Sequence, residues 1–232
     1  MYKFDIHISM KTLVISDIHL GRKFDQKKLD FLYSLFSLYD EIILNGDFWC
    51  YYSFDFKDFL NSKWNQLFPL LKEKNTIYVY GNHDRESWCN GGVNIFSDKQ
   101  VSNYTIQLGK RKFLIEHGDS HLSRLCLENK YFVKFMRNVN PLIFEIIDKA
   151  ALNTYPFFDN TIPVFFNKML KKRALRKGIT KKPQTYYING HTHYAEFDEK
   201  AKYINTGYIG NRLAQYLELG INHSELFSVQ YK

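Results

Sequence analysis

Five short motifs in this chain carry the oxygen and imidazole groups that bind metal ions. Each follows a run of residues whose pattern predicts a β-strand. In chain order they are Asp17-Ile18-His19, Gly46-Asp47, Gly81-Asn82-His83-Asp84, His117-Gly118-Asp119 and Gly190-His191-Thr192-His193. Together they offer enough ligands for two metal ions side by side. A pair of ions of this kind is well suited to the hydrolysis of phosphate esters and anhydrides.

Each motif alone has a simpler explanation. Gly46-Asp47 is typical of a plain turn, and a single histidine is more often a structural residue than a ligand. The order of all five is different, because chance does not readily place four ligand-bearing strand ends and a His-x-His pair in one chain. Imidazole is the commonest transition-metal ligand, and the two oxygens of Asp47 can bridge two cations.

The elements that must position these motifs alternate along the first half of the chain. Apolar runs predict strands at 12–16, 41–45 and 76–80, and helical periodicity predicts helices at 25–38 and 55–73. This βαβαβ order implies a parallel sheet, which usually has its site at the carboxyl ends of its strands. Further strands are predicted at 104–108, 112–116, 185–189, 194–198, 201–205, 212–219 and 225–231. We therefore expect an α/β fold in which two sheets pack as a sandwich.

Composition sets the frame for this fold. Hydrophobic residues make up 45% of the 232 residues, which suits one domain over 1–232. The three cysteines form no CxxC pair, so neither a disulfide framework nor a zinc ribbon is indicated. The sequence shows no signal-peptide pattern and no apolar run of the roughly 18 residues that a membrane span needs. We therefore expect a cytoplasmic protein.

Residues 122–184 differ in sequence pattern from the rest of the chain and are expected to form an inserted helical cap. Helices are predicted at 122–139, 142–152 and 167–177. This segment accounts for the net charge of +8. Eight of the 32 Lys and Arg residues lie within 168–182, and the other 24 are balanced by the 24 acidic residues. They are Lys168, Lys171, Lys172, Arg173, Arg176, Lys177, Lys181 and Lys182. A local basic patch implies an anionic partner.

The five motifs resemble those of the calcineurin-like metallophosphoesterases, over roughly residues 12–208. The resemblance implies a four-layer αββα sandwich and a site for two divalent metal ions, Mn²⁺ foremost, with Fe²⁺ or Zn²⁺ as alternatives. It also implies three sets of ligands. The first metal would be held by Asp17, His19 and His193. The second would be held by Asn82, His117 and His191. Asp47 would bridge them.

The chemistry expected of such a site is hydrolysis by a hydroxide held between the two ions. His83 has no expected metal role, and it would stabilise or protonate the leaving oxygen. Asp84 would fix the orientation of the His83 ring. A plain turn residue is the alternative interpretation of His83.

The substrate is less well defined by the sequence. The layout is similar to the UDP-2,3-diacylglucosamine diphosphatases of lipid A synthesis, which implies an apolar slot in the cap and contact with the inner face of a membrane. Residues Lys168, Lys171, Lys172, Arg173 and Arg176 would then meet substrate or anionic lipid. His83 and Tyr194-Ala195 depart from that subfamily. The alternatives are a soluble phosphodiesterase or nuclease and a non-catalytic scaffold of the same fold. No obligate protein partner is indicated.

Overall fold

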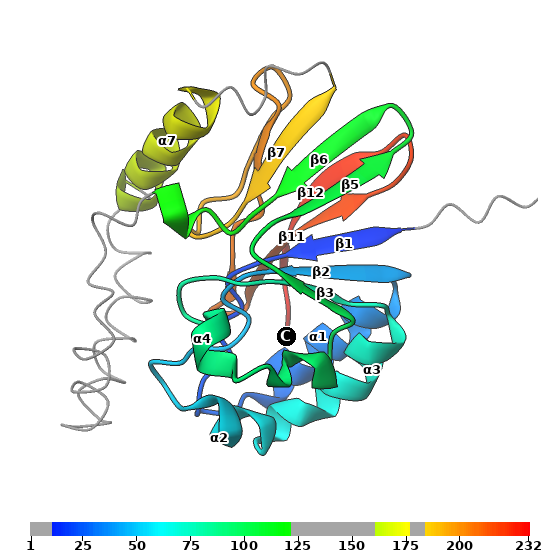
Figure 1. Ribbon diagram of the computed structural model, residues 1–232, viewed down its shortest axis with the longest axis vertical. Helices are drawn as coiled ribbons and strands as arrows, with labels where there is room; N and C mark the ends of the chain where they lie inside the picture. The colour runs from blue at the N-terminus through cyan, green and yellow to red at the C-terminus, as the bar shows by residue number, and fades with distance from the viewer. Residues whose placement is uncertain (1–10, 122–160, 177–183) are drawn as a thin grey trace, which may run out of the picture.

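The computed structural model describes residues 11–121, 161–176 and 184–232 and contains two β-sheets (Figure 1). The first sheet has the order β10-β11-β1-β2-β3-β4, and β12 also pairs with β11. Its parallel strands are β1 (Thr12–Ile15), β2 (Glu41–Asn45), β3 (Ile77–Val79) and β4 (Lys99–Val101). Its antiparallel part consists of β10 (Ile209–Gly210), β11 (Leu213–Leu219) and β12 (Ser224–Gln230).

The second sheet has the order β5-β6-β7-β9-β8. Strands β6, β7 and β9 are parallel, whereas β5 and β8 pair antiparallel at the two edges. The strands are β5 (Tyr104–Leu108), β6 (Arg111–Ile115), β7 (Thr185–Asn189), β8 (Glu196–Asp198) and β9 (Tyr203–Asn205). The second sheet therefore also has parallel strands whose carboxyl ends carry two of the motifs.

Side-chain alternation along the strands builds three hydrophobic layers. In β1, Leu13 and Ile15 belong to the core under the helices, whereas Val14 belongs to the core between the sheets. In β7, Tyr187 faces outward and its neighbours Tyr186 and Ile188 face the first sheet. Successive side chains of a strand point to opposite faces, so each sheet is covered on both sides. The predicted α/β sandwich is confirmed.

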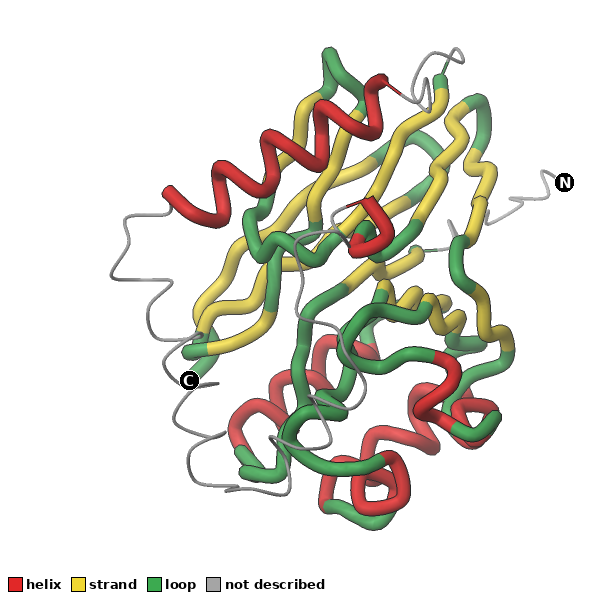
Figure 2. Tube along the Cα trace, turned by 60° about the vertical axis from the view of Figure 1, so that its left-hand side comes forward, coloured by secondary structure: helices red, strands yellow, loops and turns green. Residues whose placement is uncertain are grey.

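Helices cover the outer face of each sheet. Figure 1 shows α1 (Gln26–Ser37) and α3 (Phe68–Glu73) beside β1–β3, and α7 (Thr161–Arg176) beside β7. Figure 2 shows the strands lying between these two helical layers. Ala174 of α7 packs in the outer core with Tyr187 and Tyr203 of the second sheet. The order of layers is therefore helix, sheet, sheet, helix.

The helix predicted over 55–73 is interrupted in the structure. It consists of α2 (Phe56–Leu60), the 3₁₀ helix η1 (Lys63–Leu67) and α3. Ser62 ends the first piece because its hydroxyl donates to the Phe59 carbonyl and accepts from the Trp64 N–H. Pro69 lies in the first turn of α3, where its missing N–H costs nothing. Apolar spacing predicted helical structure in this segment but not its breaks.

Four short elements were not predicted from the sequence, besides β4 and β10. They are α4 (Glu86–Cys89) and the 3₁₀ helices η2 (Gly92–Ile95) and η3 (Asp119–His121), together with η1. Each has five residues or fewer, too few for a periodic pattern to show. They matter for function because α4 closely follows the Gly81–Asp84 motif and η3 begins at the last residue of the His117–Asp119 motif.

Helix α7 begins six residues earlier than the predicted basic helix at 167–177. Pro163 lies in its first turn, where proline is compatible with a helix. The other two predicted cap helices lie outside the described residues, so the cap over 122–184 stays a prediction. Within the described residues, no helix is both long enough and apolar enough to cross a membrane.

Candidate metal centre

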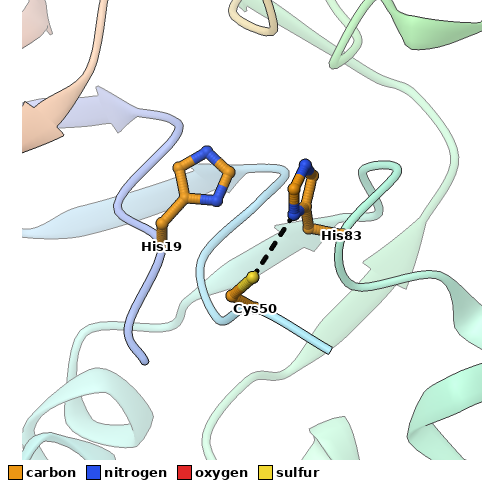
Figure 3. Close-up of side chains that lie close together, drawn as sticks. All are labelled: His19, Cys50 and His83. Atoms are coloured by element: carbon orange, nitrogen blue, oxygen red, sulfur yellow. Dashed lines mark hydrogen bonds between the residues drawn. The ribbon is translucent and has the colours of Figure 1, made fainter. Parts of the chain in front are cut away.

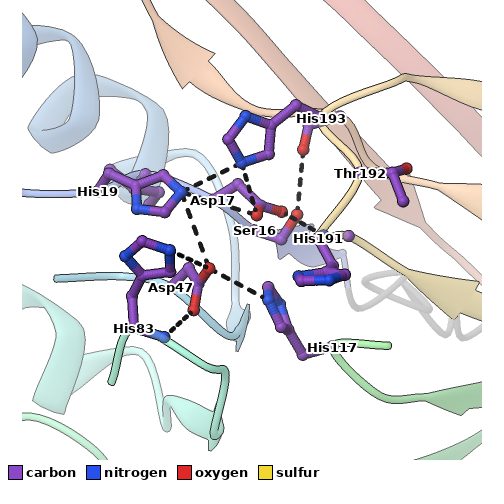
Figure 4. Close-up of polar contacts among 12 residues, drawn as sticks. Ser16, Asp17, His19, Asp47, His83, His117, His191, Thr192 and His193 are labelled. Atoms are coloured by element: carbon purple, nitrogen blue, oxygen red, sulfur yellow. Dashed lines mark hydrogen bonds and ion pairs between the residues drawn. The ribbon is translucent and has the colours of Figure 1, made fainter. Parts of the chain in front are cut away.

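The candidate ligands lie in loops that follow five strands, β1, β2 and β3 of one sheet and β6 and β7 of the other (Figure 4). Five of them have a positive φ, a region that residues other than glycine rarely adopt. They are Asp17 (53°), His19 (47°), Asp47 (56°), His191 (65°) and His193 (54°). Conformations of this kind cluster at functional sites, where surrounding contacts hold them.

Backbone hydrogen bonds between the loops hold these conformations. The N–H of Asp17 donates to the Gly46 carbonyl at 3.1 Å, and that of His19 donates to the Asp47 carbonyl at 2.9 Å. Within the second sheet, the Gly190 N–H after β7 donates to the His117 carbonyl after β6 at 3.1 Å. The loops are therefore fixed to one another before any ligand binds.

The first group of ligand atoms comes from Asp17, His19 and His193. The two histidines face each other with their Nε2 atoms 3.2 Å apart, and Nε2 of His193 lies 3.2 Å from Asp17 Oδ1. That Oδ1 is buried and accepts no hydrogen bond within the described part of the chain, whereas Oδ2 accepts the His191 N–H. An orphaned carboxylate oxygen beside two facing ring nitrogens fits a cation with three protein ligands.

The second group contains Asp47, His117 and His191. Nε2 of His117 lies 3.2 Å from Asp47 Oδ2 and 3.1 Å from Asn82 Oδ1. Nδ1 of the same ring is 2.9 Å from the Asn45 carbonyl, which accepts a hydrogen bond from it; in the neutral ring this leaves the Nε2 lone pair directed at the site. The expected second set, Asn82, His117 and His191, is therefore brought together.

Asp47 lies between the two groups. Its Oδ2 is 3.2 Å from His117 Nε2 and 3.8 Å from His19 Nε2, so one carboxylate reaches a histidine of each set. Its Oδ1 accepts the backbone N–H of His83 at 2.8 Å, which fixes the orientation of the carboxylate. This position fits the expected bridging role.

The electrostatics of the site favour the ligating protonation states of Asp17 and His191, whereas His117 must lose a proton before it binds a cation. Burial opposes the charge of Asp17, yet His193 and His117 lower its pKa to about 2. Burial, and then the nearby His117, lower the pKa of His191 to about 3. Burial opposes the charge on His117 as well, but Asp47 raises its pKa, so a cation that binds there displaces a proton.

Three motif glycines leave room for ligands from other motifs. A Cβ on Gly46 would lie 2.4 Å from His117 Nδ1, one on Gly81 would lie 2.3 Å from Asp47 Oδ1, and one on Gly190 would lie 2.3 Å from Asp17 Oδ2. The sequence suggests Gly81 as a turn residue, but its φ is not positive. Its real requirement is the close approach of the Asp47 carboxylate.

His83 lies at the rim of the site, with Nε2 4.0 Å from Asp47 Oδ2. The expectation that Asp84 orients its ring needs correction. The two Asp84 oxygens instead accept from the N–H groups of Phe48 and Gly81, both at 2.7 Å, and from the Tyr78 hydroxyl at 2.5 Å. Burial raises the pKa of Asp84 to about 7, although these donors favour its charged form. The Asp84 carboxylate therefore joins the loops after β2 and β3, through the N–H groups of Phe48 and Gly81.

The basic residues of α7 separate into two kinds. Lys171 forms ion pairs with Glu196 and Asp198, and Arg173 donates to the His121 carbonyl, so both attach α7 to the second sheet and η3. Lys168, Lys172 and Arg176 are exposed. Lys177, Lys181 and Lys182 lie outside the described residues.

Asn167 is a buried polar residue that the sequence analysis missed. It is 1% exposed, and its Oδ1 accepts from the Tyr203 hydroxyl at 2.7 Å and from Asn205 Nδ2 at 2.9 Å. Thr192 of the His191–His193 loop reaches the same oxygen at 3.3 Å. No signal in the sequence distinguishes this asparagine from a surface residue of a basic helix, because its partners come from three other elements.

A cavity of about 530 Å³ adjoins the first group of ligands. Asp17 and His19 form part of its wall. Four basic and four aromatic residues also line it: Lys23, Lys27, Lys28, Arg212, Phe24, Trp64, Tyr208 and Tyr231. Asp25, which forms an ion pair with Arg212 at 3.2 Å, is part of the wall as well. The Tyr208 ring stacks on His193, with 5.6 Å between ring centroids, so wall and ligands are in contact.

Comparison with known proteins gives similar solved structures of low sequence identity. An archaeal phosphodiesterase is 18% identical, with 95% of this chain and 99% of that chain covered and a TM-score of 0.48. The phosphoesterase YfcE from E. coli is 15% identical, with 96% and 100% covered and a TM-score of 0.43. Wild-type Vps29 from Entamoeba histolytica, complexed with Zn²⁺, is 15% identical, with 95% and 99% covered and a TM-score of 0.43.

The sequence matches no protein of curated function. Its match to a family profile is extensive, however. The profile of the calcineurin-like phosphoesterases covers residues 10–195, which includes all five motifs. The profile spans four-fifths of the chain, and the two sheets and the convergence of the motif residues are consistent with it. The chain therefore belongs to the calcineurin-like phosphoesterase family.

Proposed function

We propose that this protein is a two-metal phosphohydrolase that cleaves a phosphodiester or a phosphoanhydride. The observation that carries the proposal is the position of Asp47, whose carboxylate contacts a histidine of each ligand group. Two bound cations would supply Lewis-acid activation of water and of the phosphoryl oxygens. Asp17, His19 and His193 would hold one, and Asn82, His117 and His191 the other.

Protonation of the leaving oxygen is the step that the metal ligands do not supply, and His83 is the candidate for it. Its side chain is 22% exposed at the rim of the site, so a bound substrate can reach its ring. We assign His83 the donation of a proton to the leaving oxygen, a role worth about 10²- to 10⁴-fold in rate.

The neighbouring cavity supports a substrate with an organic group beyond the scissile phosphate. Its three lysines attract negative charge, and its aromatic rings offer apolar surface. Lys28 is held in place there, because its Nζ donates to the Ile209 carbonyl at 2.9 Å. A diester or an anhydride would fill this cavity, whereas a small monoester would leave it empty.

The test is hydrolysis by the manganese-loaded protein of bis(p-nitrophenyl) phosphate, with p-nitrophenyl phosphate for comparison. We expect faster cleavage of the diester than of the monoester, and its abolition in Asp47→Ala. For a diester with an alkyl leaving group, which needs a proton as it departs, we expect His83→Ala to lose about 10²- to 10⁴-fold in rate with metal content preserved. His223→Ala, which alters an exposed histidine paired with Glu225, is the control. Loss of metal in His83→Ala would overturn the assignment of its role. Full metal content without hydrolysis of any phosphate substrate would instead indicate a non-catalytic scaffold.

A second proposal concerns where the substrate resides. On α7, the 61% exposed Phe165 lies on one face with Lys168, Lys172 and Arg176, a stripe that suits an anionic membrane surface and a lipid substrate. Sedimentation with vesicles of phosphatidylglycerol should deplete the protein from solution, and the double variant Lys168→Glu, Lys172→Glu should stay in solution. Equal binding to neutral vesicles, or salt-dependent binding to RNA alone, would contradict the membrane proposal, and the RNA result would favour a nuclease.

A further inference from the structure

A buried thiol contacts the ring of the residue assigned as proton donor. Sγ of Cys50 lies 3.4 Å from Nδ1 of His83. Figure 3 shows the two side chains directed at each other. Cys50 is buried, with only 2% of its surface exposed, and the sequence predicts no role for it. A sulfur–nitrogen distance of this size is that of a hydrogen bond, in which the thiol or the ring nitrogen can donate.

The backbone fixes the distance between the two residues. The Cys50 N–H donates to the Leu20 carbonyl at 3.1 Å, and the N–H of Tyr51 donates to the His83 carbonyl at 2.9 Å. The His83 N–H in turn donates to Asp47 Oδ1 at 2.8 Å. The thiol, the ring and the expected bridging carboxylate are therefore held in one hydrogen-bonded unit.

Side chains around the ring leave it little freedom to turn. The Tyr52 ring meets it edge to face at a centroid distance of 4.4 Å, and the His19 ring does so at 4.6 Å. With Nδ1 directed at the Cys50 sulfur, Nε2 is the nitrogen near Asp47 Oδ2. Of the two ring nitrogens, Nε2 is therefore the one that faces the site.

The direction of this hydrogen bond decides which nitrogen of the neutral ring carries the hydrogen. If the thiol donates to Nδ1, the neutral ring bears its hydrogen on Nε2. If Nδ1 of a neutral ring donates to the sulfur, Nε2 bears no hydrogen, and only the charged ring bears one on each nitrogen. A proton on the nitrogen that faces the site therefore requires the thiol as donor or a charged ring.

We propose that Cys50 is the positioning residue for His83, which it holds with a protonated Nε2 directed at the leaving oxygen. As the P–O bond breaks, the bonding electron pair stays on that oxygen and the Nε2 proton moves to it. In the neutral arrangement the thiol proton passes to Nδ1 at the same time, and in the charged arrangement Nδ1 keeps its own. Solvent then restores the lost proton. The inference rests on the proposed phosphohydrolase function.

The test uses diesters that differ in their leaving group. A p-nitrophenolate ion leaves without a proton, whereas an alkoxide needs one, so only the second substrate depends strongly on His83. In Cys50→Ala, we expect kcat for an alkyl diester to fall about 10-fold or more, and kcat for bis(p-nitrophenyl) phosphate to stay within about 2-fold. Cys50→Ser, whose hydroxyl can make the same hydrogen bond, should restore most of the loss.

Two further measurements separate positioning from packing. Cys50→Ala should have no additional effect in a His83→Ala background, since the thiol acts through that ring. Long-range ¹H–¹⁵N NMR of the zinc-loaded protein should show the hydrogen of the neutral His83 ring on Nε2 in the wild type and a mixture of tautomers in Cys50→Ala. Cys89→Ala, which truncates another buried cysteine, is the control and should leave both readouts unchanged.

The outcomes distinguish this inference from the proposed function. A wild-type protein that cleaves no diester would refute the function. Diester cleavage in which Cys50→Ala slows both leaving groups equally, or leaves the NMR signature of His83 unchanged, would refute only the role of Cys50.

Discussion

Replacing Gly81 by alanine tests the idea that the ligands are placed by close packing between loops. A Cβ there would lie 2.3 Å from Asp47 Oδ1, 2.7 Å from the Asp47 nitrogen and 3.0 Å from Gly46 Cα. Since Cβ contacts under 3.0 Å essentially never occur, the carboxylate must retreat by at least 0.7 Å. Rotation of the side chain cannot relieve the contact with the backbone nitrogen, so the loop must move as well.

The consequence follows from the tolerance of a metal site. Ligand distances are reproducible to about 0.2 Å, so a displacement of 0.7 Å removes Asp47 from at least one cation. We expect the metal content to fall from two ions per chain toward one. We expect kcat/KM to fall about 10²-fold, the usual effect of a misplacement near 1 Å. Overpacking should lower the free energy of unfolding by about 1–3 kcal/mol.

The assay is elemental analysis after gel filtration, combined with diester hydrolysis and urea unfolding. Gly91→Ala is a matched control, because Gly91 has a φ of 72° but a Cβ there meets nothing within 4 Å. It should lose about 1–2 kcal/mol through backbone strain and keep both ions and activity. A Gly81→Ala protein with two ions and activity within about 3-fold of wild type would refute the reasoning.

Three other perturbations have definite expected outcomes. Asn167→Ala should lower the free energy of unfolding by about 3 kcal/mol in urea, because buried partners such as the Tyr203 hydroxyl lose their acceptor; a loss below about 0.5 kcal/mol would contradict this. Lys171→Met should cost about 1 kcal/mol. The Lys171 hydrogen bond lowers the pKa of Asp198 from its ordinary value of 3.8. The stability lost in Lys171→Met should therefore be constant between about pH 5 and 9 and should shrink below pH 3.8, where Asp198 begins to take up a proton. A stability difference between the variant and the wild type that does not change with pH would exclude the ion pair. Removal of metal by a chelator should lower the melting temperature. Mn²⁺ at about 100 times its Kd should then raise the free energy of unfolding by about 2.7 kcal/mol. An unchanged melting curve would argue against a metal site.

Local sequence patterns predicted much of the fold because its strands are short apolar runs that end at polar loops. The pattern at 12–16 corresponds to β1, and that at 41–45 corresponds to β2. The breaks within 55–73 escaped prediction, since a hydroxyl cap at Ser62 and a 3₁₀ turn leave the spacing of apolar residues unchanged.

The roles of individual site residues were less accessible to the sequence. It named Asp84 as the partner of His83, because adjacent residues are the natural candidates. The structure directs Asp84 to Phe48, Gly81 and Tyr78 and brings Cys50 to the ring from another loop. Such contacts depend on where separate loops meet.

The sequence by itself determined which chemical groups are present, in what order, and at the ends of which strands. Only the tertiary structure decided which of them touch, because the carboxyl ends of strands from two different sheets must meet before Asp47 can contact both His19 and His117. Ligand type is a property of single residues and can be read locally. Ligand geometry depends on sheet packing and on loops held at positive φ, which bring together residues far apart in the chain.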